Sequence, residues 1–164
     1  MAGRNSRASA ISSIPVRFNA NILGCGGTFS GGMPAADALC GPGWSICSRE
    51  VLVGYSLSKD QCRSTTIPGT GFFGANIASN INDAGFNCAT VPTATNDVVG
   101  CAHRGDDNIV HDPASVTMTC AGLTAVITSD FVPTGWSIPD GSNEATVAAL
   151  SDPTAGGALC CRDP

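Results

Sequence analysis

Nine cysteines in 164 residues constrain this chain more than any other feature of its sequence. A chain of this length can bury a sizeable core without covalent cross-links, so the cysteines need an explanation of their own. Zinc sites are typically built from closely spaced pairs such as Cys-x-x-Cys, and the sequence has no such pair. We therefore expect disulfide bonds and an oxidising, extracellular compartment. The cysteines are Cys25, Cys40, Cys47, Cys62, Cys88, Cys101, Cys120, Cys160 and Cys161.

The number of cysteines is odd, so four bridges leave one thiol over, either buried and inert or paired with another chain. Cys160 and Cys161 are adjacent, and adjacent cysteines rarely bond each other because the short ring is strained. We expect these two residues to reach different partners and to fix this segment of the chain at two places. The rest of the connectivity stays open.

Charged side chains are sparse, at 13% of residues, and the net charge is −5 with a single lysine, Lys59. Nucleic acids and anionic membrane surfaces are bound by clustered basic residues, so we expect neither as a partner. No apolar run approaches the ~20 residues of a membrane span. Residues 1–10 lack the apolar centre of a signal peptide, which leaves a removed signal and export without a cleaved signal both open.

Residues 1–13 are predicted to form a polar N-terminal arm, and residues 14–164 a single disulfide-stapled domain. Apolar and polar residues alternate strictly over 14–22, which predicts a strand with one buried face. Pro15 has no N–H to donate, which favours an edge position or a strand start. A strand that follows a loose arm pairs within its own sheet or adds to the sheet of a neighbouring copy. The candidate assembly residues are Ile14, Val16, Phe18 and Ile22.

The remaining elements are predicted to be short. Capping and stop signals place helices at 34–40, 48–55 and 142–150, and Ser58 with Gln61 has the spacing of a capping box. Strands are expected over 72–81, 116–127, 131–138 and 156–161, and the chain over 82–112 is expected to be mostly loop. The predicted fold class is α+β, a small disulfide-rich single domain of short antiparallel strands with about three short helices and long loops.

Both tryptophans lie in a repeated sequence. Gly-Trp-Ser-Ile occurs at 43–46 and again at 135–138, each time with a proline just upstream and Ser-x-Glu shortly downstream. A true repeat predicts two similar strand-to-helix units around one core, each anchored by its tryptophan, and a chance repeat is the alternative. Each tryptophan either packs in the core or offers a stacking surface to a sugar ring.

One polar segment, 101–112, gathers both histidines of the chain, His103 and His111, with several carboxylates. Carboxylate and amide oxygens are the ligands of Ca²⁺, and two histidines with one aspartate suit Zn²⁺. A polar surface loop held by Cys101 explains the same residues without a metal. We expect no cofactor, with Ca²⁺ as the main alternative. The candidate metal ligands are Asp106, Asp107, Asn108 and Asp112.

Enzymatic signatures are missing from the sequence. It has no Gly-x-Ser-x-Gly, no His-Glu-x-x-His and no glycine-rich phosphate-binding motif with its lysine. A Cys–His nucleophile would need a free thiolate, and bridging leaves only the odd cysteine available. We therefore predict that this protein is not an enzyme.

Four short segments resemble C-type-lectin-like modules: 36–40, 43–44, 96–101 and the closing Gly-Ala-Leu-Cys-Cys at 157–161. Those modules carry Trp-Asn-Asp-x-x-Cys before a calcium-loop strand, whereas Thr95 stands here in the tryptophan's place and the sugar-reading triplet is absent. The Gly-Trp element is also similar to secreted bacterial cysteine-rich surface domains. The lectin resemblance implies an α+β fold and a ligand surface on 96–112. The candidate ligand-binding residues are Asn96, Asp97, Asp106, Asp107, Asn108 and Trp136.

Two functions follow as hypotheses. The favoured one is a structural or adhesive extracellular subunit, on a cell or particle surface, that assembles with copies of itself into a filament, coat or surface layer. Sparse charge, a Gly/Ser/Thr/Ala-rich composition, the odd cysteine and the arm before the first strand favour it. The alternative is a lectin-like carbohydrate-binding module that binds glycans through the 96–112 loop, with or without Ca²⁺.

Overall fold

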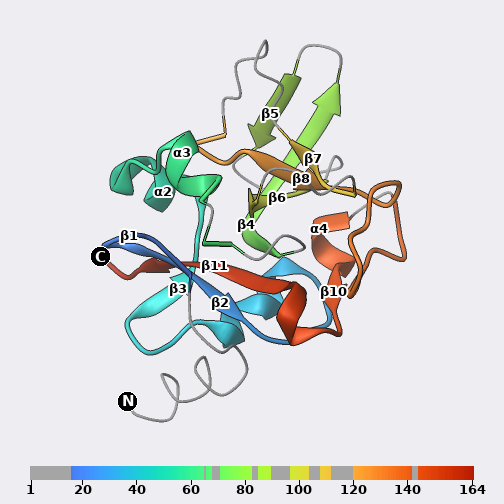
Figure 1. Cartoon of the computed structure of the whole chain (residues 1–164), viewed down its shortest axis with the longest axis horizontal. Helices are drawn as coiled ribbons and strands as arrows, with labels where there is room; N and C mark the ends of the chain where they lie inside the picture. The colour runs from blue at the N-terminus through green and yellow to red at the C-terminus, as the bar shows by residue number, and fades with distance from the viewer. Residues whose placement is uncertain are drawn as a thin grey trace.

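The computed structural model describes residues 16–64, 66–67, 71–82, 85–89, 97–103, 108–111, 120–141 and 144–164. Figure 1 shows a body built mostly of strands, with short helices around them. The mixed architecture expected from the sequence is therefore confirmed. The predicted arm, 1–13, lies outside the described residues.

Two sheets hold the strands together. The large sheet comprises β1 (Val16–Asn19), β2 (Ile22–Gly26), β3 (Trp44–Ile46), β4 (Phe72–Asn82), β5 (Gly85–Ala89), β6 (Asp97–Ala102), β7 (Val110–His111), β8 (Ala125–Ile127) and β11 (Gly156–Arg162). The small sheet comprises β9 (Trp136–Ser137) and β10 (Ala149–Leu150). The helical segments are the 3-10 helices η1 (Met33–Leu39) and η2 (Pro153–Ala155) and the α-helices α2 (Arg49–Tyr55), α3 (Lys59–Cys62) and α4 (Glu144–Val147).

The last strand in sequence lies in the middle of the large sheet. The strand order is β1-β2-β11-β4-β6-β8-β7, with β3 also paired to β11 and β5 to β4. The pair of β11 with β4 is parallel, and the other pairs are antiparallel. The expectation of short antiparallel strands therefore holds only in part, since β4 is 11 residues long and has a parallel neighbour.

The strand predicted over 14–22 ends earlier than its alternation suggests. β1 stops at Asn19, whose Oδ1 accepts the backbone N–H of Asn21 at 2.9 Å. Asparagine stabilises tight turns in this way, so the chain reverses and Ile22 begins β2. The hydrophobic alternation continues across the turn because both strands face the same core. β1 lies at an end of the strand order among the described strands, which agrees with one of the two positions that Pro15 favours.

The segment 82–112 was expected to be mostly loop, but most of its described residues lie in strands. It contributes β5, β6 and β7, and β6 lies between β4 and β8. Residues Val98 to Ala102 of β6 are all buried, so both faces of this strand are covered. A strand buried on both sides has no polar alternation, which is the signal that sequence periodicity relies on.

The helices predicted over 34–40 and 48–55 are present as η1, a 3-10 helix, and α2. The capping box of Ser58 and Gln61 is confirmed, because both of its reciprocal hydrogen bonds are present. The helix predicted over 142–150 is reduced to α4, and the chain then extends as β10. The backbone of Leu150 exchanges hydrogen bonds with that of Phe29 at 2.9 and 3.0 Å. This tertiary pairing overrides the helical preference of the alanine-rich sequence.

Two hydrophobic cores lie on either side of the central strands. Successive residues of β11 point to opposite faces, so Leu159 and Cys161 enter one core while Ala158 and Cys160 enter the other. Gly156 begins this strand at φ 127°, where a Cβ would lie 1.9 Å from the carbonyl oxygen of Phe72. Only glycine allows β11 and β4 to approach so closely at this point.

Candidate functional site

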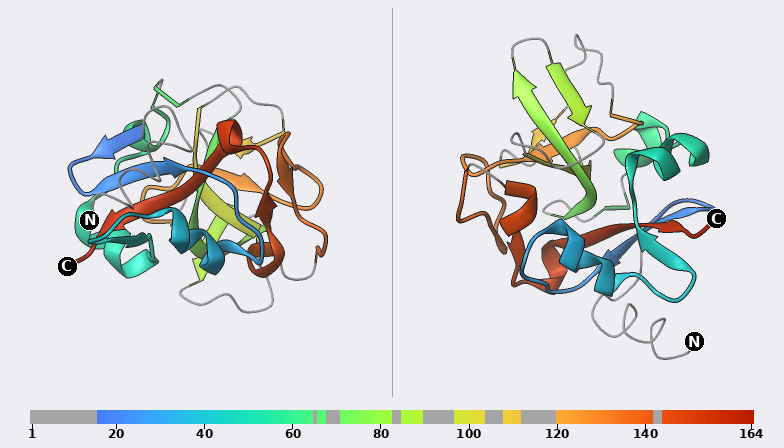
Figure 2. Two further views of the ribbon diagram at one scale, coloured as in Figure 1. Left: turned by 90° about the horizontal axis from the view of Figure 1, so that it is seen from below. Right: turned by 180° about the vertical axis from the view of Figure 1, so that it is seen from behind.

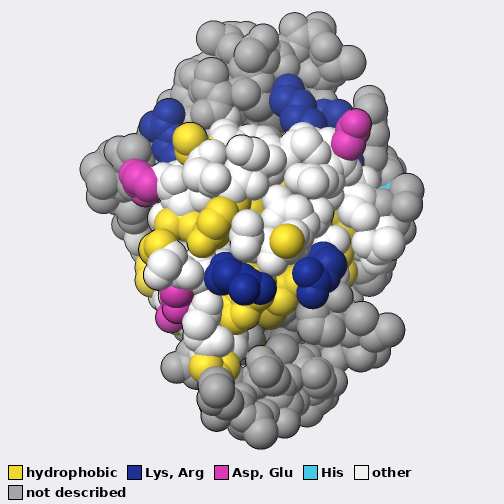
Figure 3. Space-filling model, turned by 90° about the vertical axis from the view of Figure 1, so that its left-hand side faces the viewer, with side chains coloured by type: hydrophobic (Ala, Val, Ile, Leu, Met, Phe, Trp, Pro, Cys, Tyr) yellow, Lys and Arg dark blue, Asp and Glu magenta, His cyan; other side chains and the backbone are white. Residues whose placement is uncertain are grey.

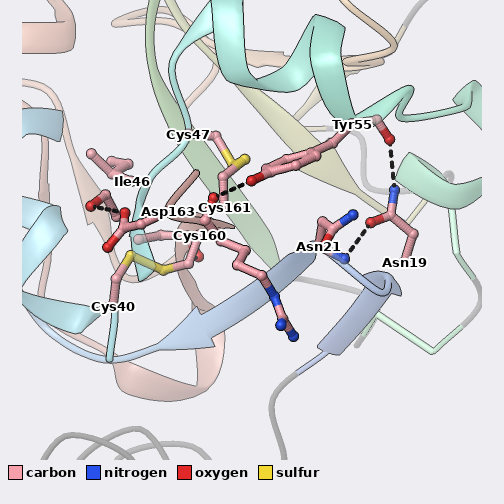
Figure 4. The surroundings of a disulfide bond; sticks show 12 residues. Asn19, Asn21, Cys40, Ile46, Cys47, Tyr55, Cys160, Cys161 and Asp163 are labelled. Carbon is pink, nitrogen blue, oxygen red and sulfur yellow. Dashed lines mark hydrogen bonds between the residues drawn. A yellow bond between two sulfur atoms is a disulfide. The ribbon is translucent and has the colours of Figure 1, made fainter. Parts of the chain in front are cut away.

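Two disulfides fix the central strand β11 to the first third of the chain. Cys40 bonds Cys160, and Cys47 bonds Cys161, with sequence separations of 120 and 114 residues. Figure 4 shows the two bridges leaving the adjacent cysteines in different directions. This follows from strand geometry, because neighbouring side chains leave a strand on opposite faces. The prediction that Cys160 and Cys161 reach different partners is therefore confirmed.

Side-chain hydrogen bonds hold the same end of β11 (Figure 4). The Tyr55 hydroxyl donates to the carbonyl oxygen of Arg162 at 2.6 Å, and the Ser45 hydroxyl donates to Oδ1 of Asp163 at 2.6 Å. Oδ1 of Asp37, at the end of η1, accepts the backbone N–H of Ile46 at 2.8 Å. The end of β11 is thus fixed to β3, η1 and α2.

The other cysteines agree with an oxidised protein. Cys62 bonds Cys101, which links α3 to β6, and Cys120 is also disulfide-bonded. Cys25 is the free cysteine of the described chain, and it is buried. Burial raises the pKa of its thiol to about 11, because an apolar environment disfavours the thiolate. Of the two fates predicted for an odd cysteine, the structure shows the buried one.

The described members of the predicted assembly residues lie in the interior of the protein. Val16, Phe18 and Ile22 are at most 8% exposed and belong to one hydrophobic core, and Ile14 lies outside the described residues. Their side chains are therefore not a surface for a second molecule. The outer backbone edge of β1 remains, together with Arg17, whose exposed side chain points away from that core.

The predicted ligand loop is described only in part. Asn96, Asp106, Asp107 and Asp112 lie outside the described residues. Asp97 is half-buried at the start of β6, and Asn108 is exposed before β7. Within the described ranges, no three His, Cys, Asp or Glu side chains come together as a metal site would require.

The two tryptophans have different surroundings. Trp136 is buried, its indole Nε1–H donates to the carbonyl oxygen of Ala155 at 3.1 Å, and its ring meets Phe29 and Phe72 edge-on. This is the core-packing interpretation, and the ring offers no open face to a sugar. Trp44 is half-buried at the surface, and the guanidinium of Arg162 lies 5.1 Å from its ring centroid.

One face of the β1–β2–β11–β3 part of the sheet carries half-buried apolar side chains bordered by two arginines. Cross-strand pairing aligns Arg17 with Leu23, Cys160 with Leu23 and Ile46, and Arg162 with Trp44. Figure 3 shows basic side chains beside apolar ones on this side of the molecule. We call this surface the arginine face; it consists of Arg17, Leu23, Trp44, Ile46 and Arg162.

A second exposed feature is the tight turn Thr128–Phe131. Thr128 and Phe131 exchange backbone hydrogen bonds at 3.1 Å, and the Thr128 hydroxyl oxygen accepts from the N–H groups of Asp130 and Phe131. The N–H of Ser129 donates to Oε1 of Glu144, a residue only 4% exposed. The turn therefore holds the exposed side chains of Asp130 and Phe131 in place, and Phe131 is 46% exposed.

Sequence reasoning missed both surfaces. The arginine face combines residues from four strands, and only the fold brings these strands together. For the turn, the sequence offers one indication, which is the charge of the segment around it. Residues 105–161 contain seven acidic side chains and no lysine or arginine, whereas residues 1–104 contain seven basic and five acidic side chains.

None of the described helices is both long and apolar enough to cross a bilayer. The chain matches no protein-family model, no curated protein and no solved structure.

Proposed function

We propose that this protein is a non-catalytic extracellular structural subunit that assembles with copies of itself. The observation that carries the proposal is the position of β1. This strand ends the sheet, directly follows the N-terminal segment, and pairs with β2 on one side only among the described strands. An edge strand presents unpaired N–H and C=O groups that template pairing with another chain.

The cross-linking pattern supports a structural role. Bridges with separations of 120, 114 and 39 residues connect the central strand, η1, α2, α3 and β6. Disulfides of this kind belong to oxidising compartments and limit unfolding by constraining the unfolded chain. A subunit of a filament, coat or surface layer must persist outside the cell, where no chaperone refolds it.

Light scattering without reductant, over a concentration series and with EDTA in parallel, tests the proposal. We expect species larger than one chain that grow with concentration and are unchanged by EDTA. A chain that stays monomeric throughout would overturn the proposal, and glycan binding with and without Ca²⁺ would then be the next experiment, with Asp106→Ala/Asp107→Ala as the variant.

Deletion of residues 1–13 tests the part played by the arm. We expect the shortened chain to keep its circular dichroism spectrum and to lose its large species. Full assembly by the shortened chain would show that the arm is not needed.

A further inference from the structure

We propose that the subunits associate head to tail, with the Thr128–Phe131 turn of one copy seated on the arginine face of the next. This inference rests on the proposed self-assembly and names the side-chain surfaces that would meet beside the edge of β1, the strand that carries Arg17. The β1 side and the 128–141 segment lie at opposite ends of the molecule in all the views of Figures 1 and 2. Contact between two different ends of identical subunits generates open filaments or closed rings.

The distribution of charge favours this orientation. Residues 105–161 carry seven acidic side chains and no lysine or arginine, which gives a formal charge of −7, against +2 for residues 1–104. The turn belongs to the acidic segment, and the arginine face comes mostly from the other. Within the 128–141 segment Asp130 and Asp140 are exposed, and their charges are opposite to those of Arg17 and Arg162 on the arginine face. Opposite charges on two surfaces steer encounters into a head-to-tail arrangement.

The side chains match at short range. Phe131 is one of only two exposed large hydrophobic residues among the described ones, the other being Val53. Arginine guanidinium planes stack on aromatic rings and pair with carboxylates. The arginine face offers Arg17 and Arg162 around apolar side chains, so a phenyl ring and the neighbouring Asp130 carboxylate can engage it together.

The local acids of the arginine face are already engaged. Asp37 accepts the N–H of Ile46, and Asp163 accepts the hydroxyl of Ser45. Arg162 stacks on Trp44 in the isolated subunit, which places its charge at the surface before any partner arrives. The turn is likewise held by its own hydrogen bonds, so little conformational freedom is lost when the two surfaces meet.

Two full-length variants and their mixture test the inference by light scattering at low salt. Phe131→Ser removes the aromatic side chain of the turn, and Arg17→Glu reverses a charge on the arginine face. We expect each variant alone to raise the concentration needed for association by about 30-fold or more, as loss of a central aromatic or charged contact does. The matched controls are Val53→Ser and Arg49→Glu, which should assemble like the unchanged protein.

The one-to-one mixture of Phe131→Ser and Arg17→Glu distinguishes the geometry. The first variant keeps its arginine face and the second keeps its turn, so a single contact forms and we expect dimers that do not grow. Raising the salt to 1 M should weaken them, since the Debye length falls to about 3 Å. Assembly of the single variants at unchanged concentration would overturn the head-to-tail contact and leave self-assembly standing. A monomeric unchanged protein would overturn both.

Discussion

The two Gly-Trp-Ser-Ile segments, 43–46 and 135–138, form the same local structure in two different settings. In each, the glycine has a positive φ, 78° at Gly43 and 92° at Gly135. In each, the tryptophan N–H donates to a carbonyl oxygen three residues earlier, at 3.0 and 3.1 Å. A short strand begins at each tryptophan and a helix comes later, which is the strand-to-helix arrangement expected of a repeat, although only Trp136 is buried as an anchor.

The two segments also form the same kind of hydrogen bond with their neighbouring strands. The carbonyl oxygen of Gly43 accepts the N–H of Asp163 at 2.9 Å, and that of Gly135 accepts the N–H of Ser151 at 2.8 Å. The residues opposite the tryptophans differ, with Arg162 facing Trp44 and Leu150 facing Trp136. The two segments therefore share a local conformation but differ in what surrounds the tryptophan, since Phe29 and Phe72 pack on Trp136 and Arg162 lies over Trp44.

The segments also differ in how they are anchored. Cys40 and Cys47 flank the first segment and bond Cys160 and Cys161, whereas the second is held by noncovalent packing around Trp136. The first unit is held by disulfide bonds and the second by noncovalent packing, and the following predictions test that difference.

The largest effect is expected from the two bridges that flank the first segment. Their loops interleave along the chain, so once one bridge is closed the other closes an effective loop of only about nine residues. Chain entropy then predicts a loss of about 2–3 kcal/mol for either Cys40→Ala/Cys160→Ala or Cys47→Ala/Cys161→Ala, and about 7 kcal/mol for all four substitutions. Urea unfolding measures these free energies, and strictly additive losses would contradict this dependence of one loop on the other.

The next largest effect should come from truncating the two tryptophans, whose losses of unfolding free energy should differ because one ring is buried and the other half-buried. Trp136→Ala removes a buried ring and should lower the free energy of unfolding by about 3–5 kcal/mol. Trp44→Ala removes a half-buried ring and should cost about 1–2 kcal/mol, in line with its partial burial. Equal losses in urea unfolding would show that exposure does not distinguish the two.

The two glycines give a matched pair of smaller changes. A Cβ on Gly135 would lie 2.8 Å from Cβ of Asp152, whereas a Cβ on Gly43 would meet nothing within 4 Å. Gly43→Ala should cost about 1 kcal/mol through backbone strain alone, and Gly135→Ala about 2–3 kcal/mol because it adds a clash. Thermal unfolding of both variants tests the order, and a larger loss at Gly43 would refute it.

Removing the guanidinium beside Trp44 should have a modest effect. Arg162→Ala eliminates an exposed cation–π contact and should lower stability by about 0.5–1 kcal/mol. The same substitution in a Trp44→Ala background should cost less, because the two side chains act on each other. Equal losses in the two backgrounds, measured by urea unfolding, would show that they do not interact.

The smallest change concerns pH near the second segment. The Thr154 hydroxyl and backbone N–H donate to Oδ1 of Asp152 and lower the pKa of its carboxyl below the usual value. A group with a depressed folded pKa stabilises the fold above its unfolded pKa of about 3.9, and that stability is lost as pH falls through the folded value. Asp152→Asn should therefore flatten the dependence of the melting temperature on pH below about 4, and an unchanged slope would contradict this.

The sequence predicted the features that depend on neighbouring residues. The capping box of Ser58 and Gln61, the helix after Ser48 and the divergence of Cys160 and Cys161 all follow from local geometry. The sequence-based prediction failed where pairing between residues far apart in the chain determines the secondary structure. Strand β6 has no alternation because both faces are covered, and the helix over 142–150 gives way where Leu150 pairs with Phe29.

The candidate surfaces were harder to predict than the fold. Val16, Phe18 and Ile22 have the alternation of a strand face, but alternation does not say whether that face meets the protein's own core or a neighbour. The sheet supplies its own core, so these residues are buried. Arg17 and Arg162 are 145 positions apart in the chain and share a face only because β2 and β11 are adjacent.

The central place of β11 bears on how the protein is made. A ribosome releases the chain from its N-terminus, so β2 and β4 emerge long before the strand that lies between them. The middle of the sheet and two of its bridges can form only after Arg162 has left the exit tunnel. A chain that ends before β11 therefore lacks the strand between β2 and β4, and its Cys40 and Cys47 lack Cys160 and Cys161 as partners. The architecture thus makes translation through β11 a condition for closing the large sheet.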